Sequence, residues 1–225
     1  YDGYSYRGID PAGDSLDLRT AWTKIRLTGG RNNVLCITGY GDEVLLFFID
    51  RNSSVQCRIP ALTGADPSST RITCVSESSN GFFWIGTEGG AVFALNPEDC
   101  SFKSHPKIST APIRALCEDR EGHVWVGTGR GLFSIEASDI ATAHPQPTIL
   151  PRQLAEGDIA TLACGKDGRL WVCVNDGPFA WMDPVTYFVT FCKPIPAVES
   201  HLHIRSACVD SAGNIWIAAT GSGLL

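Results

Sequence analysis

The sequence predicts an all-β fold, a β-propeller of four-stranded antiparallel blades. Two observations carry this prediction: a tryptophan recurs at spacings of 41, 46 and 45 residues, and a glycine stands three positions before each one. A repeat of about 40 to 45 residues is typical of propellers, in which each sheet covers the apolar face of the next around an axis. The tryptophans are Trp84, Trp125, Trp171 and Trp216, and the glycines are Gly81, Gly122, Gly168 and Gly213.

Each repeat is expected to form a strand, a tight turn and a second strand that contains the tryptophan. In the copy at 113–135, an apolar strand ends before Gly122, which accepts the positive φ of a hairpin turn. Residues 123–128 then return, and residues 131–135 form a third strand. We expect the same pattern at 72–87, 159–174 and 204–219, with no helix longer than two turns. The four tryptophans should be buried between blades, because their rings are large and apolar.

An earlier blade lacks the tryptophan. Turn-forming residues recur once per blade, at the turn between the third and the fourth strand. One of them, Asp50, precedes the first tryptophan. Residues 34–39 then align with the tryptophan strand, with Cys36 in the tryptophan position. We expect a partial blade at 1–20, a divergent blade at 21–62, blades at 63–105, 106–150 and 151–197, and a partial blade at 198–225.

These segments amount to about five blade equivalents in one propeller array. Because the chain begins in mid-blade and stops within a strand, we expect the array to be part of a larger, seven-bladed ring. Pairing of residues 223–225 with residues 4–9 would instead close a ring of five blades.

The repeat resembles the two-component-regulator propeller family, whose blade contains an Asp-x-x-Gly turn, Trp-Ile-Gly-Thr and a Gly-Leu strand. Residues 84–87 and 125–132 match this pattern, and residues 1–6 look like a segment that often closes the first blade. The match departs from the pattern at residues 171–174 and 216–219. The resemblance implies a ligand-sensing periplasmic domain of a hybrid two-component histidine kinase and response regulator from Bacteroides-like bacteria. In that family the ligand is an oligosaccharide derived from a polysaccharide.

Composition excludes several partners. The net charge is −6, and the 18 basic residues are scattered, which argues against nucleic acid. The longest apolar run, Val44 to Ile49, is far short of the roughly 20 residues that a membrane span needs. The expected partners are an oligosaccharide-like ligand, adjoining blades or a second propeller, and a second subunit in a homodimer.

Candidate chemistry is sparse, so we expect a binding domain with no catalytic residues, no cofactor and no metal. His201 and His203 lack an evident third ligand for a metal. Asp119 and Asp210 are explained better by capped turns than by calcium. The nine cysteines are interpreted as small buried hydrophobes in preference to a disulfide framework, and their odd number leaves at least one thiol unpaired within the chain.

The candidate ligand site lies on one rim. In a propeller, the connections from second to third strand and from fourth to first strand open on the same rim, which is the usual ligand face. Arg114 and Arg205 each follow the first isoleucine of a first strand, and Arg130 lies in a second-to-third connection. These arginines could bind a carboxylate or sulfate through paired N–H groups, or serve as solvated charges or inter-blade ion pairs. The same rim should carry Arg71, Glu88, Arg152, Asn175, Asp176, His201 and His203.

Two alternative functions remain open. A propeller lyase of the streptogramin-inactivating type has a similar repeat, and it would need a histidine base with carboxylates and a divalent ion on one rim. His123 is the only histidine near a repeat core, and it should lie on the opposite rim. A protein-docking scaffold like the WD-repeat propellers would show recurring Gly-His and Trp-Asp pairs, which are absent in repeat register.

Overall fold

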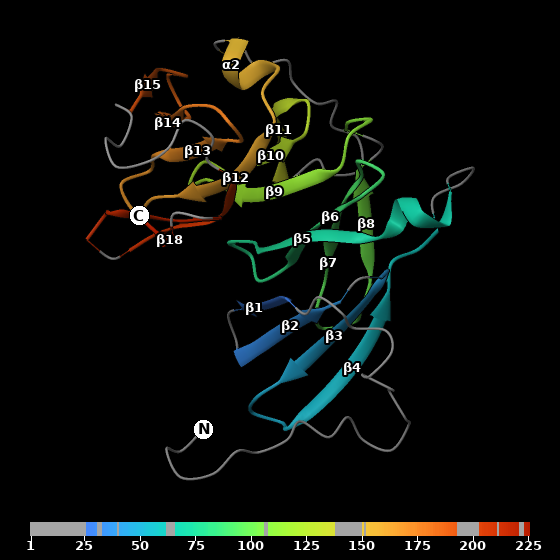
Figure 1. Ribbon diagram of the computed structural model, residues 1–225. Coiled ribbons are helices and arrows are strands. Elements are labelled where there is room, and N and C mark those ends of the chain that lie inside the picture. Colours follow the sequence, from blue (N-terminus) through green and yellow to red (C-terminus); the bar gives the residue numbers. More distant parts are fainter. Residues whose placement is uncertain are drawn as a thin grey trace.

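Five small antiparallel sheets, arranged as a five-bladed β-propeller, make up this chain (Figure 1). The computed structural model describes residues 26–30, 33–39, 41–61, 66–105, 108–137, 150, 152–192, 203–210, 212–220 and 223–225. Within them, the helices are the 3₁₀ turn η2 (Pro67–Thr70) and α2 (Arg152–Ala155), each of four residues. The predicted all-β propeller is therefore confirmed. The predicted larger, seven-bladed ring stays a prediction, and residues 1–20 lie outside the described residues.

The blades follow one another along the chain, and each is a meander of consecutive strands. Blade 1 contains β1 (Arg26–Gly30), β2 (Val34–Thr38), β3 (Glu43–Phe48) and β4 (Ser53–Arg58). Blade 2 contains β5 (Ile72–Glu77), β6 (Phe83–Thr87), β7 (Val92–Leu95) and β8 (Phe102–His105). Blade 3 contains β9 (Ile113–Glu118), β10 (His123–Thr128) and β11 (Gly131–Glu136). Blade 4 contains β12 (Ile159–Cys164), β13 (Leu170–Val174), β14 (Phe179–Met182) and β15 (Val189–Phe191), and blade 5 contains β16 (Ile204–Val209), β17 (Ile215–Ala219) and β18 (Gly223–Leu224).

The tight turns between first and second strands have the predicted backbone. The φ angles of Gly81, Gly122, Gly168 and Gly213 are 82°, 87°, 85° and 87°. A residue with a side chain rarely adopts this left-handed conformation, so the glycine fixes where each hairpin turns. The predicted strand boundaries around these turns are confirmed.

Consecutive blades pack through their apolar faces, with the first strands side by side. The glycine of the Trp-Ile-Gly-Thr pattern makes this packing close. A Cβ atom on Gly86 would lie 2.5 Å from Ile113 of the next blade, and one on Gly127 would lie 2.6 Å from Ile159. The glycine therefore leaves room for the first isoleucine of the following blade.

The burial of the tryptophans differs among blades. Trp84 and Trp125 are buried and Trp171 is half-buried, whereas Trp216 is 43% exposed. The prediction of burial between blades is wrong for Trp216, because no described element packs on that face of blade 5. Cys36 is buried between blades 1 and 2, as predicted for the residue in the tryptophan position.

Two disulfides join neighbouring blades. Cys57 pairs with Cys100 across blades 1 and 2, and Cys117 pairs with Cys164 across blades 3 and 4. The preferred interpretation of the cysteines as unpaired small hydrophobes is wrong for these four, because packing brings residues 43 and 47 positions apart to Cα separations of 5.9 and 6.2 Å. Five cysteines remain free: Cys36, Cys74, Cys173, Cys192 and Cys208.

Candidate functional site

The rim predicted to bind a ligand is formed by the connections that follow residues 87, 128, 174 and 219, and we call it the arginine rim. Each of blades 2 to 5 has a β-bulge at the second residue of its first strand, where two residues oppose one on the partner strand. Arg114 and Arg205 occupy this bulge in blades 3 and 5, and both are exposed. A bulge redirects the side chain of its extra residue, so both guanidinium groups project from the sheet at this rim.

Arg114 forms an ion pair between blades. Its Nε lies 3.0 Å from Oδ1 of Asp158, which directly precedes the first strand of blade 4. Asn175 donates a hydrogen bond of 3.0 Å to the other oxygen of the same carboxylate. The Arg114 side chain is still 43% exposed, and the ion pair uses only its Nε, so the other N–H groups can serve a ligand.

Arg130 lies close to Arg114, and Arg205 lies two blades further along the rim. Arg130 belongs to the turn between β10 and β11 and donates through Nη1 to Oγ1 of Thr110 at 3.1 Å. A Cβ atom on the preceding residue, Gly129, would lie 3.6 Å from Nε and Nη2 of Arg114, so this turn runs beside the Arg114 side chain. Arg205 donates through Nε to Oγ1 of Thr220 in its own blade, at 2.8 Å. The structure thus brings two of the three predicted residues together and keeps the third apart.

Other residues predicted for the arginine rim also lie there. In blades 2, 4 and 5, a backbone hydrogen bond joins the connection after the second strand to the segment before the first strand. Glu88 donates to Arg71, Asn175 to Asp158, and Thr220 to His203. His201 lies outside the described residues. The described residues contain no group of three His, Cys, Asp or Glu side chains that could hold a metal ion, and none of their helices could cross a membrane.

The opposite rim is formed by the turns at Gly81, Gly122, Gly168 and Gly213, and we call it the hairpin rim. This rim contains the buried carboxylate of Asp119. This carboxylate accepts from the backbone N–H groups of Glu121 and His123, each at 2.9 Å, and from Nε1 of Trp125 at 2.7 Å. Asp210 makes the corresponding contacts with Ala212, Asn214 and Trp216. The explanation of Asp119 and Asp210 as capped turns is therefore confirmed.

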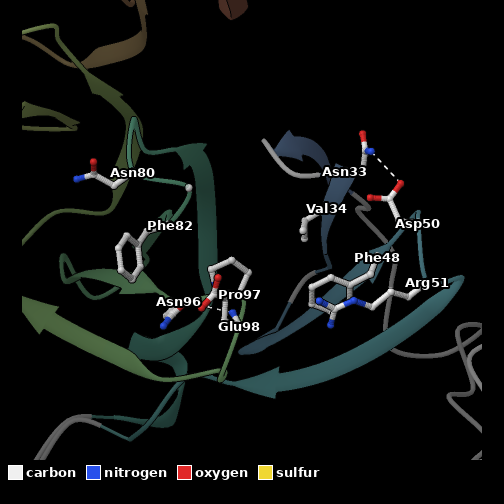
Figure 2. Close-up of a pocket in the computed structure, with 11 residues that line it drawn as sticks. Asn33, Val34, Phe48, Asp50, Arg51, Asn80, Phe82, Asn96, Pro97 and Glu98 are labelled. Atoms are coloured by element: carbon white, nitrogen blue, oxygen red, sulfur yellow. Dashed lines mark hydrogen bonds between the residues drawn. The ribbon is translucent and has the colours of Figure 1, made fainter.

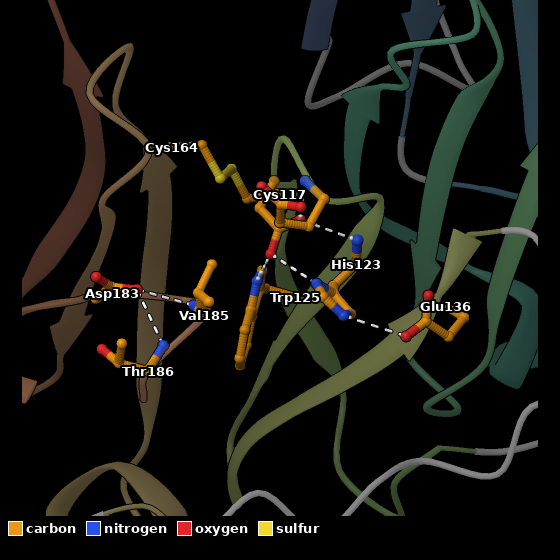
Figure 3. A network of polar contacts seen from close by, with 10 residues as sticks. Cys117, His123, Trp125, Glu136, Cys164, Asp183, Val185 and Thr186 are labelled. Carbon is orange, nitrogen blue, oxygen red and sulfur yellow. Dashed lines mark hydrogen bonds and ion pairs between the residues drawn. A yellow bond between two sulfur atoms is a disulfide. The ribbon is translucent and has the colours of Figure 1, made fainter. Parts of the chain in front are cut away.

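His123 lies on the hairpin rim, as predicted, between two carboxylates. Its Nδ1 is 3.1 Å from Asp119 and its Nε2 is 3.1 Å from Glu136 (Figure 3). Both ring nitrogens are thus engaged by side chains of the same blade. A general base needs a free nitrogen within reach of a substrate proton, and this histidine offers none in the observed arrangement.

Blade 2 uses a different partner for its tryptophan. Ser78 stands where blade 3 has Asp119, and Nε1 of Trp84 donates instead to Glu118 of the next blade at 2.6 Å. The backbone and hydroxyl of Ser79 also donate to Glu118. Partial burial acts to raise the pKa of this carboxyl, but these hydrogen bonds outweigh it and the pKa is lowered. The sequence analysis missed Glu118, although the serine in place of the turn aspartate was a visible signal.

Three crevices open between blades on the hairpin rim. The largest, of about 660 Å³, lies between blades 1 and 2 (Figure 2). The other two, of about 350 and 320 Å³, lie beside the turns of blades 2, 3 and 4. The sequence analysis placed its candidate site on the other rim and did not anticipate these crevices, because their walls come from turns that differ from blade to blade.

Two segments of the chain match the model of a known family. Residues 66–89 and 107–130, which contain the first hairpins of blades 2 and 3, match the family described as two component regulator propeller. Comparison of the sequence with curated proteins gave no match.

Solved structures with the same fold include a lyase and the extracellular domains of two putative hybrid two component systems. Virginiamycin B lyase from Staphylococcus aureus is 14% identical, with a TM-score of 0.67 over 88% of this chain and 67% of the lyase. The extracellular domain of the putative hybrid two component system BT4673 from B. thetaiotaomicron is 18% identical, with a TM-score of 0.65 over 90% of this chain and 27% of that one. The extracellular domain of the putative hybrid two component system BT3049 from the same organism is 20% identical, with a TM-score of 0.64 over 89% and 26%.

At these identities the structural likeness establishes the fold alone, and the family match concerns two segments of the chain. The two matched segments coincide with the two blades whose tryptophans are buried and whose Trp-Ile/Val-Gly-Thr strands are complete. These two segments are therefore similar to two-component regulator propeller repeats, as the sequence motifs predicted.

Proposed function

We propose that this chain is a ligand-sensing propeller domain of a hybrid two-component signalling protein. The observation that carries the proposal is the pair of arginines at the bulges of β9 and β16, within an array that contains two-component regulator propeller repeats. Exposed guanidinium groups at one rim favour an anionic ligand, because each offers a fork of N–H donors to a carboxylate or sulfate. An oligosaccharide that carries uronic acid or sulfate groups fits this chemistry.

The location that we propose is extracytoplasmic, in the periplasm. Two inter-blade disulfides suit an oxidising compartment, since structural disulfides are rare where thiols are kept reduced. The sensor neighbours are themselves extracellular domains. Signalling would then require partners beyond this chain, and we propose adjoining blades or a second propeller, with a homodimer as the assembly that transmits the signal.

Calorimetric titration of the purified chain with anionic and neutral oligosaccharides tests the ligand proposal. The double variant Arg114→Ala, Arg205→Ala should lose at least about tenfold in affinity for an anionic oligosaccharide, since charge-assisted hydrogen bonds contribute about 1.5 to 3 kcal/mol each. Arg120→Ala, on the hairpin rim, is the matched control and should bind as the unmodified chain does. Equal affinity in the double variant would exclude the arginine rim as the site.

A second candidate function is a propeller lyase. The observation that favours it is the likeness of the fold to virginiamycin B lyase, and His123 is the described histidine that has carboxylates on both sides. Incubation with a streptogramin B antibiotic and mass spectrometry of the products tests this candidate. We expect no turnover, because both nitrogens of His123 are already engaged. Turnover that disappears in His123→Ala would replace the binding function with a catalytic one.

A further inference from the structure

The 660 Å³ crevice occurs at the one described blade junction where the repeat lacks its tryptophan. In blade 3 the indole of Trp125 extends to the hairpin rim, where its Nε1 reaches the turn carboxylate of Asp119. In blade 1 the same position holds Cys36, whose side chain is too short to reach a turn. The 660 Å³ crevice lies at the hairpin end of this junction. Its volume is within the range of small-molecule sites.

The crevice has two walls, one from blade 1 and one from blade 2, and each wall contains an aromatic ring. Phe48 and Arg51 form one wall, where the guanidinium lies 5.4 Å from the ring centroid, and Phe82 lies on the other side (Figure 2). Two aromatic rings therefore border the space. The full lining is Asn33, Val34, Phe48, Asp50, Arg51, Asn80, Gly81, Phe82, Asn96, Pro97 and Glu98.

Several polar groups of the lining have unused hydrogen-bonding capacity. Asn33 is committed to Asp50 at 2.9 Å, and Oδ1 of Asn96 accepts from the backbone of Glu98 at 3.1 Å. By contrast, the side-chain amide of Asn80, Nδ2 of Asn96 and the carboxylate of Glu98 have no partner among the described residues. A side-chain amide can both donate and accept hydrogen bonds, and a carboxylate can accept them at two oxygens. These groups can therefore hydrogen-bond adjacent hydroxyls of a ligand.

Charge and polarity narrow the class of ligand. The lining carries one cation, Arg51, and two carboxylates, Asp50 and Glu98, so it does not favour a phosphate, sulfate or uronic acid. More than half of the lining residues are polar or charged, which disfavours a lipid-like ligand. An uncharged ring with hydroxyl groups at its edge and C–H groups on its faces satisfies both the amides and the phenyl rings.

We propose that the crevice between blades 1 and 2 binds an uncharged sugar unit, at a site distinct from the arginine rim. Asn80 and Glu98 hydrogen-bond its hydroxyls, and Phe82 packs against its C–H face. This inference does not rest on the proposed function, because it concerns the opposite rim and a ligand of different charge.

Calorimetric titration with uncharged tetrasaccharides built from glucose, mannose, galactose or xylose tests the proposal. At least one should bind, and the double variant Asn80→Ala, Glu98→Gln should bind it about tenfold more weakly, since both side chains that hydrogen-bond its hydroxyls are changed. Phe82→Leu, which keeps the site apolar without the ring, should also weaken binding. Glu121→Ala is the matched control, because it changes the equivalent of Asn80 in the turn of blade 3.

The outcomes separate this site from the arginine rim. Binding that weakens in the Asn80 and Glu98 variant but not in the Arg114 and Arg205 variant supports the crevice. No binding of any uncharged tetrasaccharide, or binding that the crevice variant leaves unchanged, overturns it. Circular dichroism spectra that match those of the unmodified chain ensure that a loss of affinity reports the site and not unfolding.

Discussion

In blade 3 the indole of Trp125 is fully buried against blade 4, whereas the equivalent indole of Trp216 in blade 5 is 43% exposed. The two residues share the same register: Trp125 pairs with Cys117 across the hairpin, and Trp216 pairs with Cys208. Both indoles also donate to the aspartate six positions earlier, at 2.7 and 2.9 Å. The hairpin and its tryptophan–aspartate contact therefore form whether or not a neighbour covers them.

The next blade is what distinguishes the two surfaces. In blade 3, Trp125 and Leu132 pack against the apolar face of blade 4, and Cys117 is bonded to Cys164. In blade 5 the equivalents Leu224 and Cys208 are exposed, with Cys208 a free thiol. Burial in this fold is thus supplied by the neighbouring sheet, as expected for an array in which each unit contacts only the next.

The largest expected effect concerns the two tryptophans. Trp125→Ala should lower the free energy of unfolding by about 3 to 5 kcal/mol, because it leaves a cavity between blades 3 and 4. Trp216→Ala should cost about 1 kcal/mol or less, since its ring is already partly in water. Chemical denaturation of both variants measures the difference. Similar losses in the two variants would show that Trp216 is covered in solution.

The cysteines give the next largest contrast. Replacement of both Cys117 and Cys164 by serine should cost about 2 to 4 kcal/mol, the usual contribution of a disulfide that closes a long loop. Cys208→Ser should have almost no effect on stability, because this thiol is exposed and unpaired. Mass spectrometry after brief treatment of the folded chain with iodoacetamide should find Cys208 alkylated and Cys117 unmodified. Rapid alkylation of Cys117 would contradict the disulfide.

Local features of the fold could be predicted from the sequence, and features that depend on a neighbouring blade could not. Gly122 and the residues around Trp125 determine their own turn and strand, so their positions were correct. The exposure of Trp216 was missed because the burial of this ring depends on a following blade and not on its own hairpin. The disulfide between Cys117 and Cys164 was missed for a related reason, although its separation of 47 residues, close to one repeat, was a usable signal.

The same division applies to the candidate sites. The repeat placed Arg114 and Arg205 on one rim, because the rim follows from strand direction alone. The repeat could not show that Asp158 of the following blade forms an ion pair with Arg114 and so balances its positive charge. The crevice between blades 1 and 2 depends on Cys36 and on turns without a common pattern. A departure from a repeat is where a specific site is expected, and Cys36 was visible in the sequence as such a departure.

The smallest effect that we predict is a titration in the exposed blade. Hydrogen bonds from Asn214, from the indole of Trp216 and from nearby backbone lower the pKa of Asp210 from its ordinary value of 3.8 to about 2. Because the folded pKa is below the unfolded one, the contribution of Asp210 to stability is complete above about pH 4 and is lost as the pH falls through about 2. The Nε1–H resonance of Trp216 in NMR spectra should therefore shift with a midpoint near pH 2. Asp210→Asn should abolish that shift, and a midpoint near 3.8 would mean that the tryptophan–aspartate contact does not persist in solution without a covering blade.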